Sequence, residues 1–234
     1  MSYILTDATV IADGRDLSGE SNEVGIEFAR ADLNPTNFRS TGTEHRAGMV
    51  DATGSVSGFW TPDTDEQFDT LGADSVDLII APAAAAGTPC FVLDAKVTSV
   101  TRGGAIDELL PFSFSFGNAR RNGVAHGRIL FDPTTVVAFP VAATGFQLGS
   151  VSGSITFHVH VLRADDSGAL DLDIESSATN GWTVPDVEET VEGLIEGDSV
   201  SVTVPGPVTN SWWRVNVTGI DGPSQLLVVV EDHA

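Results

Sequence analysis

Alternation of apolar and polar residues is the feature that most constrains how this chain folds. Phenylalanine and serine alternate over residues 112–116, and apolar residues alternate with polar or small ones over residues 24–28 and 50–60. Side chains of a β-strand point in turn to opposite faces, so such runs predict strands with one buried face. Similar runs recur, separated by glycine and proline. We therefore predict an all-β protein of two antiparallel β-sandwich or barrel domains.

A turn at residues 132–134 separates two groups of predicted strands. We expect a first β domain over residues 1–133 and a second β-sandwich domain over residues 134–234. Each group also has an acidic segment with a helix-like start, at residues 61–72 and 183–195, which predicts a short flanking helix. The order helix, strand, strand, strand thus occurs twice. It is equally compatible with an internal duplication and with chance similarity of two acidic β domains.

A long polar segment lies between the strands predicted at residues 24–28 and 50–60. Residues 30–49 include Pro35, Gly42 and Gly48 and few apolar side chains. A connection of this length within a compact domain is uncommon and is usually functional or ordered by a partner. We predict that it is an assembly loop.

The charge of the chain restricts its partners. Asp and Glu number 33 against 11 Lys and Arg, for a formal net charge of −22, and Lys96 is the only lysine. The acidic residues are dispersed among strand patterns, which favours a salt-adapted surface over a disordered acidic chain. We therefore expect an extremely halophilic source. Binding to nucleic-acid phosphates needs clustered basic residues and is not expected.

Other sequence signals concern location and redox state. Cys90 is the only cysteine, so no disulfide within the chain is expected. The first residues do not resemble a signal peptide, and no apolar run approaches the length of a membrane span. We expect a protein that is made in the cytoplasm and does not enter a membrane.

Few residues suggest chemistry. His158 and His160 are two apart on a predicted strand and could place two metal ligands on one face, but a strand with two histidines on its polar face needs no metal. No nucleophile elbow, phosphate loop or paired catalytic carboxylates stand out, so we predict no enzyme and no cofactor. The alternative is a metal- or glycan-binding jelly roll over residues 136–234, with these histidines or Trp213 at its site.

Several stretches together carry a family resemblance. They are the strand at residues 24–28, the loop with Asn34-Pro35-Thr36-Asn37-Phe38 and His45-Arg46-Ala47-Gly48-Met49, and the return strand at residues 51–58. The segment near Phe68, the turn at residues 103–107 and the runs at 157–161 and 206–214 also fit. With these, the chain resembles the tail tube (major tail) proteins of long-tailed double-stranded DNA viruses. Its salt-adapted surface adds the expectation of a virus of halophilic archaea.

The resemblance implies a protein that polymerises. Tail tube proteins form rings of β-sandwich subunits with a flanking helix, and the rings stack into a tube in which a long loop reaches the next ring. On this chain that inter-ring loop carries Asn34, Pro35, Asn37, Phe38, Arg39, His45 and Arg46. Candidate subunit-interface residues are the basic residues Arg120, Arg121 and Arg128, which could face acidic neighbours, and Trp213.

The same resemblance implies the partners and the location. The chain would bind copies of itself and other tail proteins at the tube ends, while viral DNA passes through an acidic lumen that repels phosphates. If both domains line the tube, three chains form a ring, which the repeated element order favours. If only the first does, six chains form the ring and the second domain decorates it. The expected location is the virion tail, assembled in the host cytoplasm.

Overall fold

The computed structural model describes most of the chain. The described residues are 8–19, 21–33, 46–59, 75–104, 109–119, 125–136, 141–142, 145–164, 169–220, 222 and 224–231. Every regular element within these ranges is a β-strand, which confirms the prediction of an all-β protein. No helix in this part of the chain is long and apolar enough to cross a membrane. The helix predicted at residues 61–72 lies outside the described residues.

Contacts within the chain divide it into two compact units. Unit 1 comprises Met1–Ser18, Ile79–Val92 and Ala125–Ala234, and unit 2 comprises Gly19–Leu78 and Leu93–Val124. The boundary predicted at residue 133 falls inside a continuous strand, Ala125–Val136. The compact units therefore do not follow the predicted division, because strands from the first half complete the sheet of unit 1.

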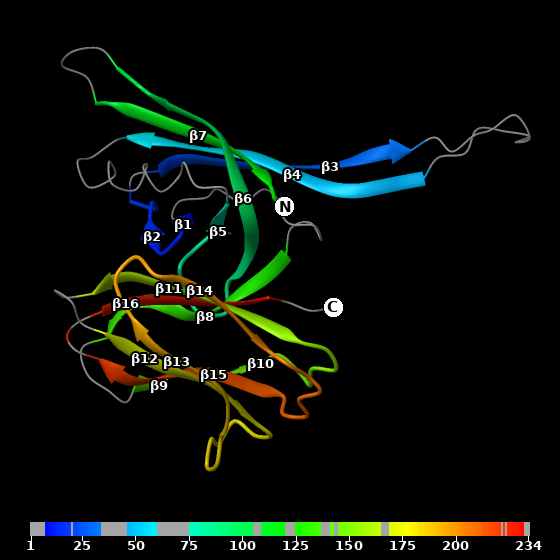
Figure 1. Ribbon diagram of the computed structural model, residues 1–234, viewed down its shortest axis with the longest axis vertical. Coiled ribbons are helices and arrows are strands. Elements are labelled where there is room, and N and C mark those ends of the chain that lie inside the picture. The colour runs from blue at the N-terminus through cyan, green and yellow to red at the C-terminus, as the bar shows by residue number, and fades with distance from the viewer. Residues whose placement is uncertain are drawn as a thin grey trace, which may run out of the picture. The chain divides into compact units, whose positions relative to one another are not determined.

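Unit 1 contains a two-layer β-sandwich of antiparallel strands (Figure 1). The order of one layer is β14-β11-β16-β8, and that of the other is β10-β15-β12-β13, with β9 also on β15. The strands of the first layer are β8 (Ala125–Val136), β11 (Ile155–Ala164), β14 (Ser199–Val204) and β16 (Ser224–Glu231). Those of the second are β9 (Val141–Ala142), β10 (Phe146–Gln147), β12 (Leu170–Ser177), β13 (Asp186–Leu194) and β15 (Trp212–Ile220).

The core of the sandwich is formed by alternate residues of facing strands. Phe157, Val159 and Val161 of β11 are completely buried, as are Trp213 and Val215 of β15. The rings of Phe157 and Trp213 are tilted against each other with centroids 5.6 Å apart. Such aromatic pairs bury a large apolar area, so this contact is a main source of the stability of unit 1.

The outer face of the first layer has a second, smaller core. Its strands continue the first layer from β8 in the order β6-β5-β1-β2. They are β1 (Thr9–Ala12), β2 (Arg15–Asp16), the end of β5 (Val76–Ala81) and the start of β6 (Pro89–Arg102). Buried Ile11, Ile79 and Val92 pack there with Leu227 and Val229 of β16. Strand β16 is therefore buried on both faces, which explains its nearly unbroken apolar sequence.

Unit 2 is built on a sheet of four antiparallel strands, in the order β3-β4-β7-β6. The strands are β3 (Ser21–Leu33), β4 (Arg46–Phe59), β7 (Pro111–Asn118) and the part of β6 that follows Val92. Phe112, Phe114 and Phe116 of β7 are each at most 2% exposed, while the serines between them are half-buried. The one-sided phenylalanine–serine pattern is confirmed.

The helix predicted at residues 183–195 is wrong, because Asp186–Leu194 is strand β13. The prediction rested on the helix-like start at Pro185 and the acidic residues after it. Val187, Val191 and Leu194 also have the spacing of a helix face. Pairing with β12 has register shifts between Val187 and Glu189 and between Val191 and Leu194. Bulges of this kind absorb extra residues, so a helical spacing of apolar residues fits a strand.

The predicted polar loop is shorter than expected. Strand β3 continues to Leu33 and β4 begins at Arg46, and the two pair from Ser21 and Gly58 to Leu33 and Arg46. Residues 30–33 and 46–49 of the predicted loop therefore lie in the strands of a β-hairpin. The remaining residues, 34–45, lie outside the described part of the chain.

Candidate assembly surface

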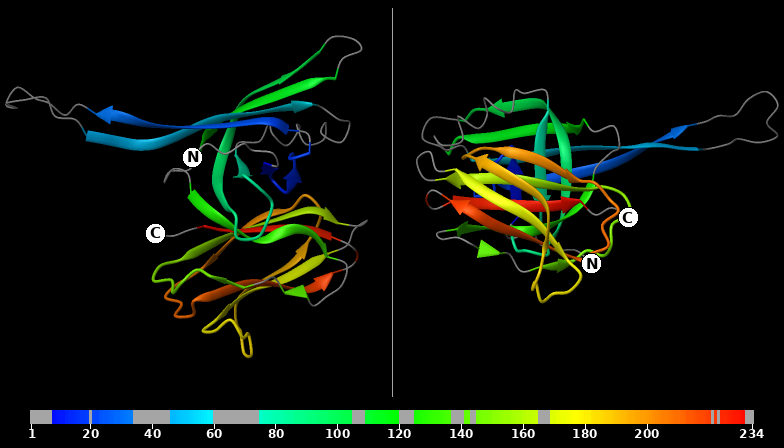
Figure 2. Two further views of the ribbon diagram at one scale, coloured as in Figure 1. Left: turned by 180° about the vertical axis from the view of Figure 1, so that it is seen from behind. Right: turned by 60° about the horizontal axis from the view of Figure 1, so that its bottom comes forward.

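The β3–β4 hairpin extends beyond the sheet to which it belongs. Strand β7 pairs with β4 only over Thr53–Phe59, whereas β3 pairs with β4 as far as Arg46. Residues 28–33 and 46–52 therefore form a two-stranded ribbon with no third strand among the described residues. Figure 2 shows this ribbon, in blue and cyan, running out past β7. An isolated two-stranded ribbon is at best marginally stable in water, so an arm of this kind gains from contact with a partner.

An apolar stripe on β3 runs toward the ribbon and ends, among the side chains that the structure describes, at Phe28. Val24, Ile26 and Phe28 lie on the face that also carries the β7 phenylalanines, because Val24 is aligned with Val56 and Phe114. Burial decreases along the stripe: Val24 and Ile26 are half-buried, but Phe28 is 46% exposed. The apolar face thus continues past the point at which unit 2 covers it. Sequence reasoning missed Phe28, although its alternation with Ile26 was visible.

The opposite face of the four-stranded sheet is polar and has small side chains. Gly25, Ser55, Ser115 and Ser99 form one row across the four strands. The neighbouring rows are Glu23, Ser57, Ser113 and Thr101, and Glu27, Thr53, Gly117 and Lys96. With Asp51, this gives three carboxylates against one ammonium group. The other residues of these rows are glycine, serine and threonine, so most of the face is smooth, and the carboxylates make its net charge negative.

A shallow hollow of about 510 Å³ lies on this face, where glycines leave the backbone uncovered. A Cβ atom added at Gly25 or Gly117 would meet nothing within 4 Å, so glycine there lowers the surface. Gly54 is different: its added Cβ would lie 2.3 Å from the Gly25 carbonyl oxygen and 2.5 Å from the Phe116 ring. Only glycine therefore lets β3 and the Phe116 ring approach β4 at this point.

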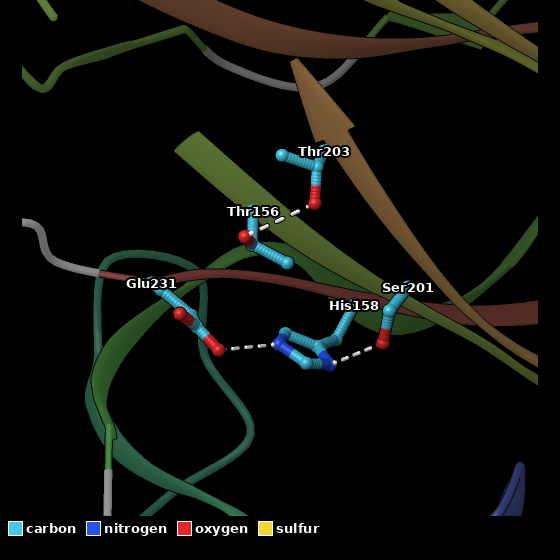
Figure 3. Close-up of polar contacts among 5 residues, drawn as sticks. All are labelled: Thr156, His158, Ser201, Thr203 and Glu231. Carbon is cyan, nitrogen blue, oxygen red and sulfur yellow. Dashed lines mark hydrogen bonds and ion pairs between the residues drawn. The ribbon is translucent and has the colours of Figure 1, made fainter. Parts of the chain in front are cut away.

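The two candidate metal ligands, His158 and His160, are completely buried on the outer face of β11. Nε2 of His158 lies 2.9 Å from Oε1 of Glu231, and its Nδ1 lies 3.0 Å from the hydroxyl of Ser201 (Figure 3). The backbone N–H of Gly14 donates to Nδ1 of His160 at 3.3 Å. The described residues contain no group of three or more side chains that could hold a metal ion. The pair therefore joins strands β14, β11 and β16 and the β1–β2 turn.

Trp213 is not available at a subunit interface, which corrects the prediction made for it. Its side chain is completely buried in the sandwich core of unit 1. The neighbouring Trp212 points to the opposite face of β15 and is half-buried. The same burial excludes Trp213 as an open platform for a sugar ring.

A polar cluster on the outer face of β12 and β15 was missed by sequence reasoning. Nε of Arg214 donates to Glu175 at 2.6 Å, and the amide of Asn216 donates to the same carboxylate at 3.0 Å. The guanidinium of Arg214 also lies 4.3 Å from the centre of the Trp182 ring. An added Cβ at Gly145 would meet that ring at 2.3 Å, so Trp182 is held between Gly145 and Arg214. The cluster fixes the β12–β13 loop to the sheet. No single sequence motif predicts it.

The other predicted interface residues are only partly described. Arg128 is half-buried in β8, and its Nε has no hydrogen-bond partner among the described residues. Arg120 and Arg121 lie outside the described residues, as do Asn34, Pro35, Asn37, Phe38, Arg39 and His45 of the predicted inter-ring loop. Arg46 is the first residue of β4. The roles of these residues stay predictions.

Comparisons with known proteins add weak structural likenesses. No family model and no curated protein matches this sequence. The chain is similar to a protein of the virion of the native gene transfer agent particle, with 16% identity and a TM-score of 0.41 over 53% of this chain and 98% of that chain. It is also similar to the Dit protein of phage SPP1, with 14% identity and a TM-score of 0.35 over 97% of this chain and 99% of that chain. A protein of the phage p2 baseplate is similar with 8% identity and a TM-score of 0.34 over 95% of this chain and 97% of that chain. Likenesses with such low TM-scores do not establish a common fold.

Proposed function

We propose that this protein is a structural component of a virus tail and that it polymerises into stacked rings forming the tail tube. The observation that carries the proposal is the two-stranded β3–β4 ribbon, which leaves the sheet of unit 2 with Phe28 exposed at its base. A phenylalanine with 46% of its side chain exposed at the base of a two-stranded arm is of little benefit to a monomer. A subunit that stacks on a neighbouring ring gains a docking element, in line with the family resemblance of the sequence.

The four-stranded sheet of unit 2 supplies the proposed wall of the tube. Its outermost strand β3 pairs only with β4 among the described strands, so its other edge can hydrogen-bond to a neighbouring chain once high salt screens the charges of Glu23 and Glu27. Its polar face, with Glu23, Glu27 and Asp51, would then line the lumen. A smooth surface of glycine, serine and threonine with a negative charge repels DNA phosphates and offers few contacts that would retard the passage of the genome.

We propose rings of six chains in which residues of unit 1 lie outside the wall. The alternative of three chains depended on a repeated order of elements that began with a helix in each half. Since the second of these helices is strand β13, the halves no longer share that order. One four-stranded sheet per chain is then the unit that repeats around the ring.

Electron microscopy of the purified protein in molar salt tests the proposal. We expect hollow tubes of uniform diameter, because high salt screens the repulsion between chains of charge −22. Discrete particles at every salt concentration, together with a stoichiometric metal ion or glycan binding, would instead support a binding domain and contradict the tube.

The role of the ribbon is tested by Phe28→Ser with Val184→Ser as the matched control. Both residues are exposed apolar side chains, at 46% and 81%, but Val184 lies in the β12–β13 loop of unit 1. We expect Phe28→Ser to remain folded and to form few or no tubes, and Val184→Ser to assemble normally. Deleting residues 36–46 should have the stronger effect of leaving folded subunits that do not stack. Normal tubes from both ribbon variants would show that the arm has no part in assembly.

A further inference from the structure

Strand β14 differs from the other strands at the edges of the sheets. Those strands either have only two residues, as β2, β9 and β10 do, or carry charged side chains. Strand β3 carries Glu23 and Glu27, and β13 carries Glu188, Glu189 and Glu192. Strand β14 has six residues, Ser-Val-Ser-Val-Thr-Val, and no charge. Short length and charge are the usual means by which proteins protect an edge from pairing, so β14 is the unprotected edge of this part of the chain.

The hydrogen-bond pattern shows which backbone groups of β14 are available. The N–H of Val161 donates to the carbonyl of Asp198 at 2.9 Å, and β11 and β14 then pair from His160 and Ser199 to Ile155 and Val204. Because hydrogen-bonded and non-hydrogen-bonded pairs alternate in an antiparallel ladder, Ser199, Ser201 and Thr203 occupy non-hydrogen-bonded positions. Their N–H and C=O groups point away from β11.

Side-chain contacts support this assignment. Side chains meet most closely at non-hydrogen-bonded pairs, and two such contacts join β11 to β14. The hydroxyls of Thr156 and Thr203 lie 3.3 Å apart, and the hydroxyl of Ser201 lies 3.0 Å from His158 (Figure 3). Both β14 residues are nevertheless exposed. The strand is thus hydrogen-bonded to β11 on its inner side, and no other described strand pairs with its outer side.

We propose that the outer edge of β14 binds an extended, positively charged segment of another polypeptide, which adds a strand to the first layer of unit 1. Main-chain hydrogen bonds to Ser199, Ser201 and Thr203 would provide the affinity. The half-buried Val200 and Val202 point into the sandwich core and favour apolar residues at alternate positions of the guest.

Charge decides the kind of partner. Glu196 and Asp198 lie in the turn before β14, and the glutamates of β13 precede that turn. Arg15 lies beside this turn, with Nη2 3.8 Å from a Cβ added at Gly197. A second copy of this chain would bring the same acidic surroundings and would be repelled. A segment with lysine or arginine at alternate positions is attracted instead.

The test uses the full chain and a capped hexapeptide of alternating valine and lysine, with binding measured by calorimetry in 0.1 M salt. A control peptide has the same sequence and charge but an N-methyl group on every backbone amide, so neither of its edges can donate the hydrogen bonds of a strand. We expect the first peptide to bind and the methylated one not to bind. Binding should weaken as salt rises to 2 M. Equal binding of the two peptides, or no binding of either, overturns the proposal.

Proline variants locate the binding edge. In Thr203→Pro the outward N–H is lost while the ladder to β11 keeps its bonds, so the affinity should fall at least about tenfold. Thr203→Val retains the N–H and should bind as the wild-type chain does. Ser199→Pro, at the first residue of the strand, repeats the test if Thr203→Pro fails to fold. Unchanged peptide affinity in a folded proline variant contradicts the proposal. Loss of self-association without any effect on the peptide would identify a second copy as the occupant and also contradict it.

Discussion

The β-sheets of the two units differ in how far their faces are buried. In unit 1 the sheet of β14, β11, β16 and β8 is covered on one face by the second layer and on the other by β1 and β5. In unit 2 the sheet keeps one polar face open, and its β3–β4 hairpin continues past the region where the apolar face is buried. In the first arrangement both faces of the sheet are covered within one chain. In the second, the exposed Phe28 and the outer edge of β3 could be covered by another chain.

This difference separates the residues that stabilise the monomer from those that serve assembly. Completely buried residues such as Phe157 and Trp213 hold unit 1 together and contribute nothing to a surface. Residues such as Phe28 add little to the stability of the monomer and become useful when copies associate. Substitutions should therefore divide into those that unfold the chain and those that only prevent its polymerisation.

The largest effect is expected for Trp213→Ala. It should lower the free energy of unfolding by about 3–5 kcal/mol, because it removes the ring that packs on Phe157 in the core of unit 1. Trp212→Ala, on the half-buried face of the same strand, should cost well under half as much. Thermal or denaturant unfolding measures both. Equal losses would mean that the two faces of β15 are not distinguished as the structure shows.

The next largest effect is expected for Glu175→Ala. The side chains of Glu175 and Arg214 are only 5% and 16% exposed, so removing the carboxylate leaves a mostly buried guanidinium without its charge partner. We expect a loss of about 3 kcal/mol in the free energy of unfolding. Asp173 lies on β12, like Glu175, and accepts an exposed hydrogen bond from Thr190 of β13. Asp173→Ala removes this bond and should lower the free energy of unfolding by about 0.5–1 kcal/mol. A cost for Asp173→Ala that matched that of Glu175→Ala would show that burial does not set the difference.

A smaller effect is expected within unit 2 for Gly54→Ala. The new methyl group would meet the Gly25 carbonyl and the Phe116 ring, so we expect a loss of about 1–3 kcal/mol. Gly117→Ala places the same methyl group in open space on the polar face and should change stability by less than about 0.5 kcal/mol. Unfolding curves of the two variants compare the two faces of the sheet directly. A Gly117→Ala variant as unstable as Gly54→Ala would contradict the assignment of an open face.

A smaller change in monomer stability than that of Gly54→Ala is expected for Phe28→Ser. With 46% of its side chain exposed, Phe28 should contribute less than about 1 kcal/mol to the unfolding free energy of the monomer. The measurement is denaturant unfolding under conditions that prevent polymerisation. A loss as large as that of Trp213→Ala would show that the ribbon is part of the core of unit 2 and not an arm reserved for assembly.

Individual elements show how far the sequence predicted the structure. The alternation over residues 112–116 correctly predicted a strand with buried phenylalanines, because period-two patterns depend only on which face is buried. The acidic segment around β13 was predicted as a helix, because bulges in its pairing with β12 cannot be read from one strand alone. Of the loop predicted at residues 30–49, residues 30–33 and 46–49 proved to be paired strand, since polar residues on a two-stranded ribbon lack the pattern of a buried face.

The sequence by itself determined the fold class, the strands with one buried face and the acidic surface, since these follow from residue types and local spacing. Only the tertiary structure decided that Trp213 and both histidines are buried and that Phe28 stands exposed on an arm. It also decided that β14 is an edge. The physical reason is that burial and edge position depend on which distant strands pair. In this chain, strands from the first third of the sequence complete the sheet formed by the last.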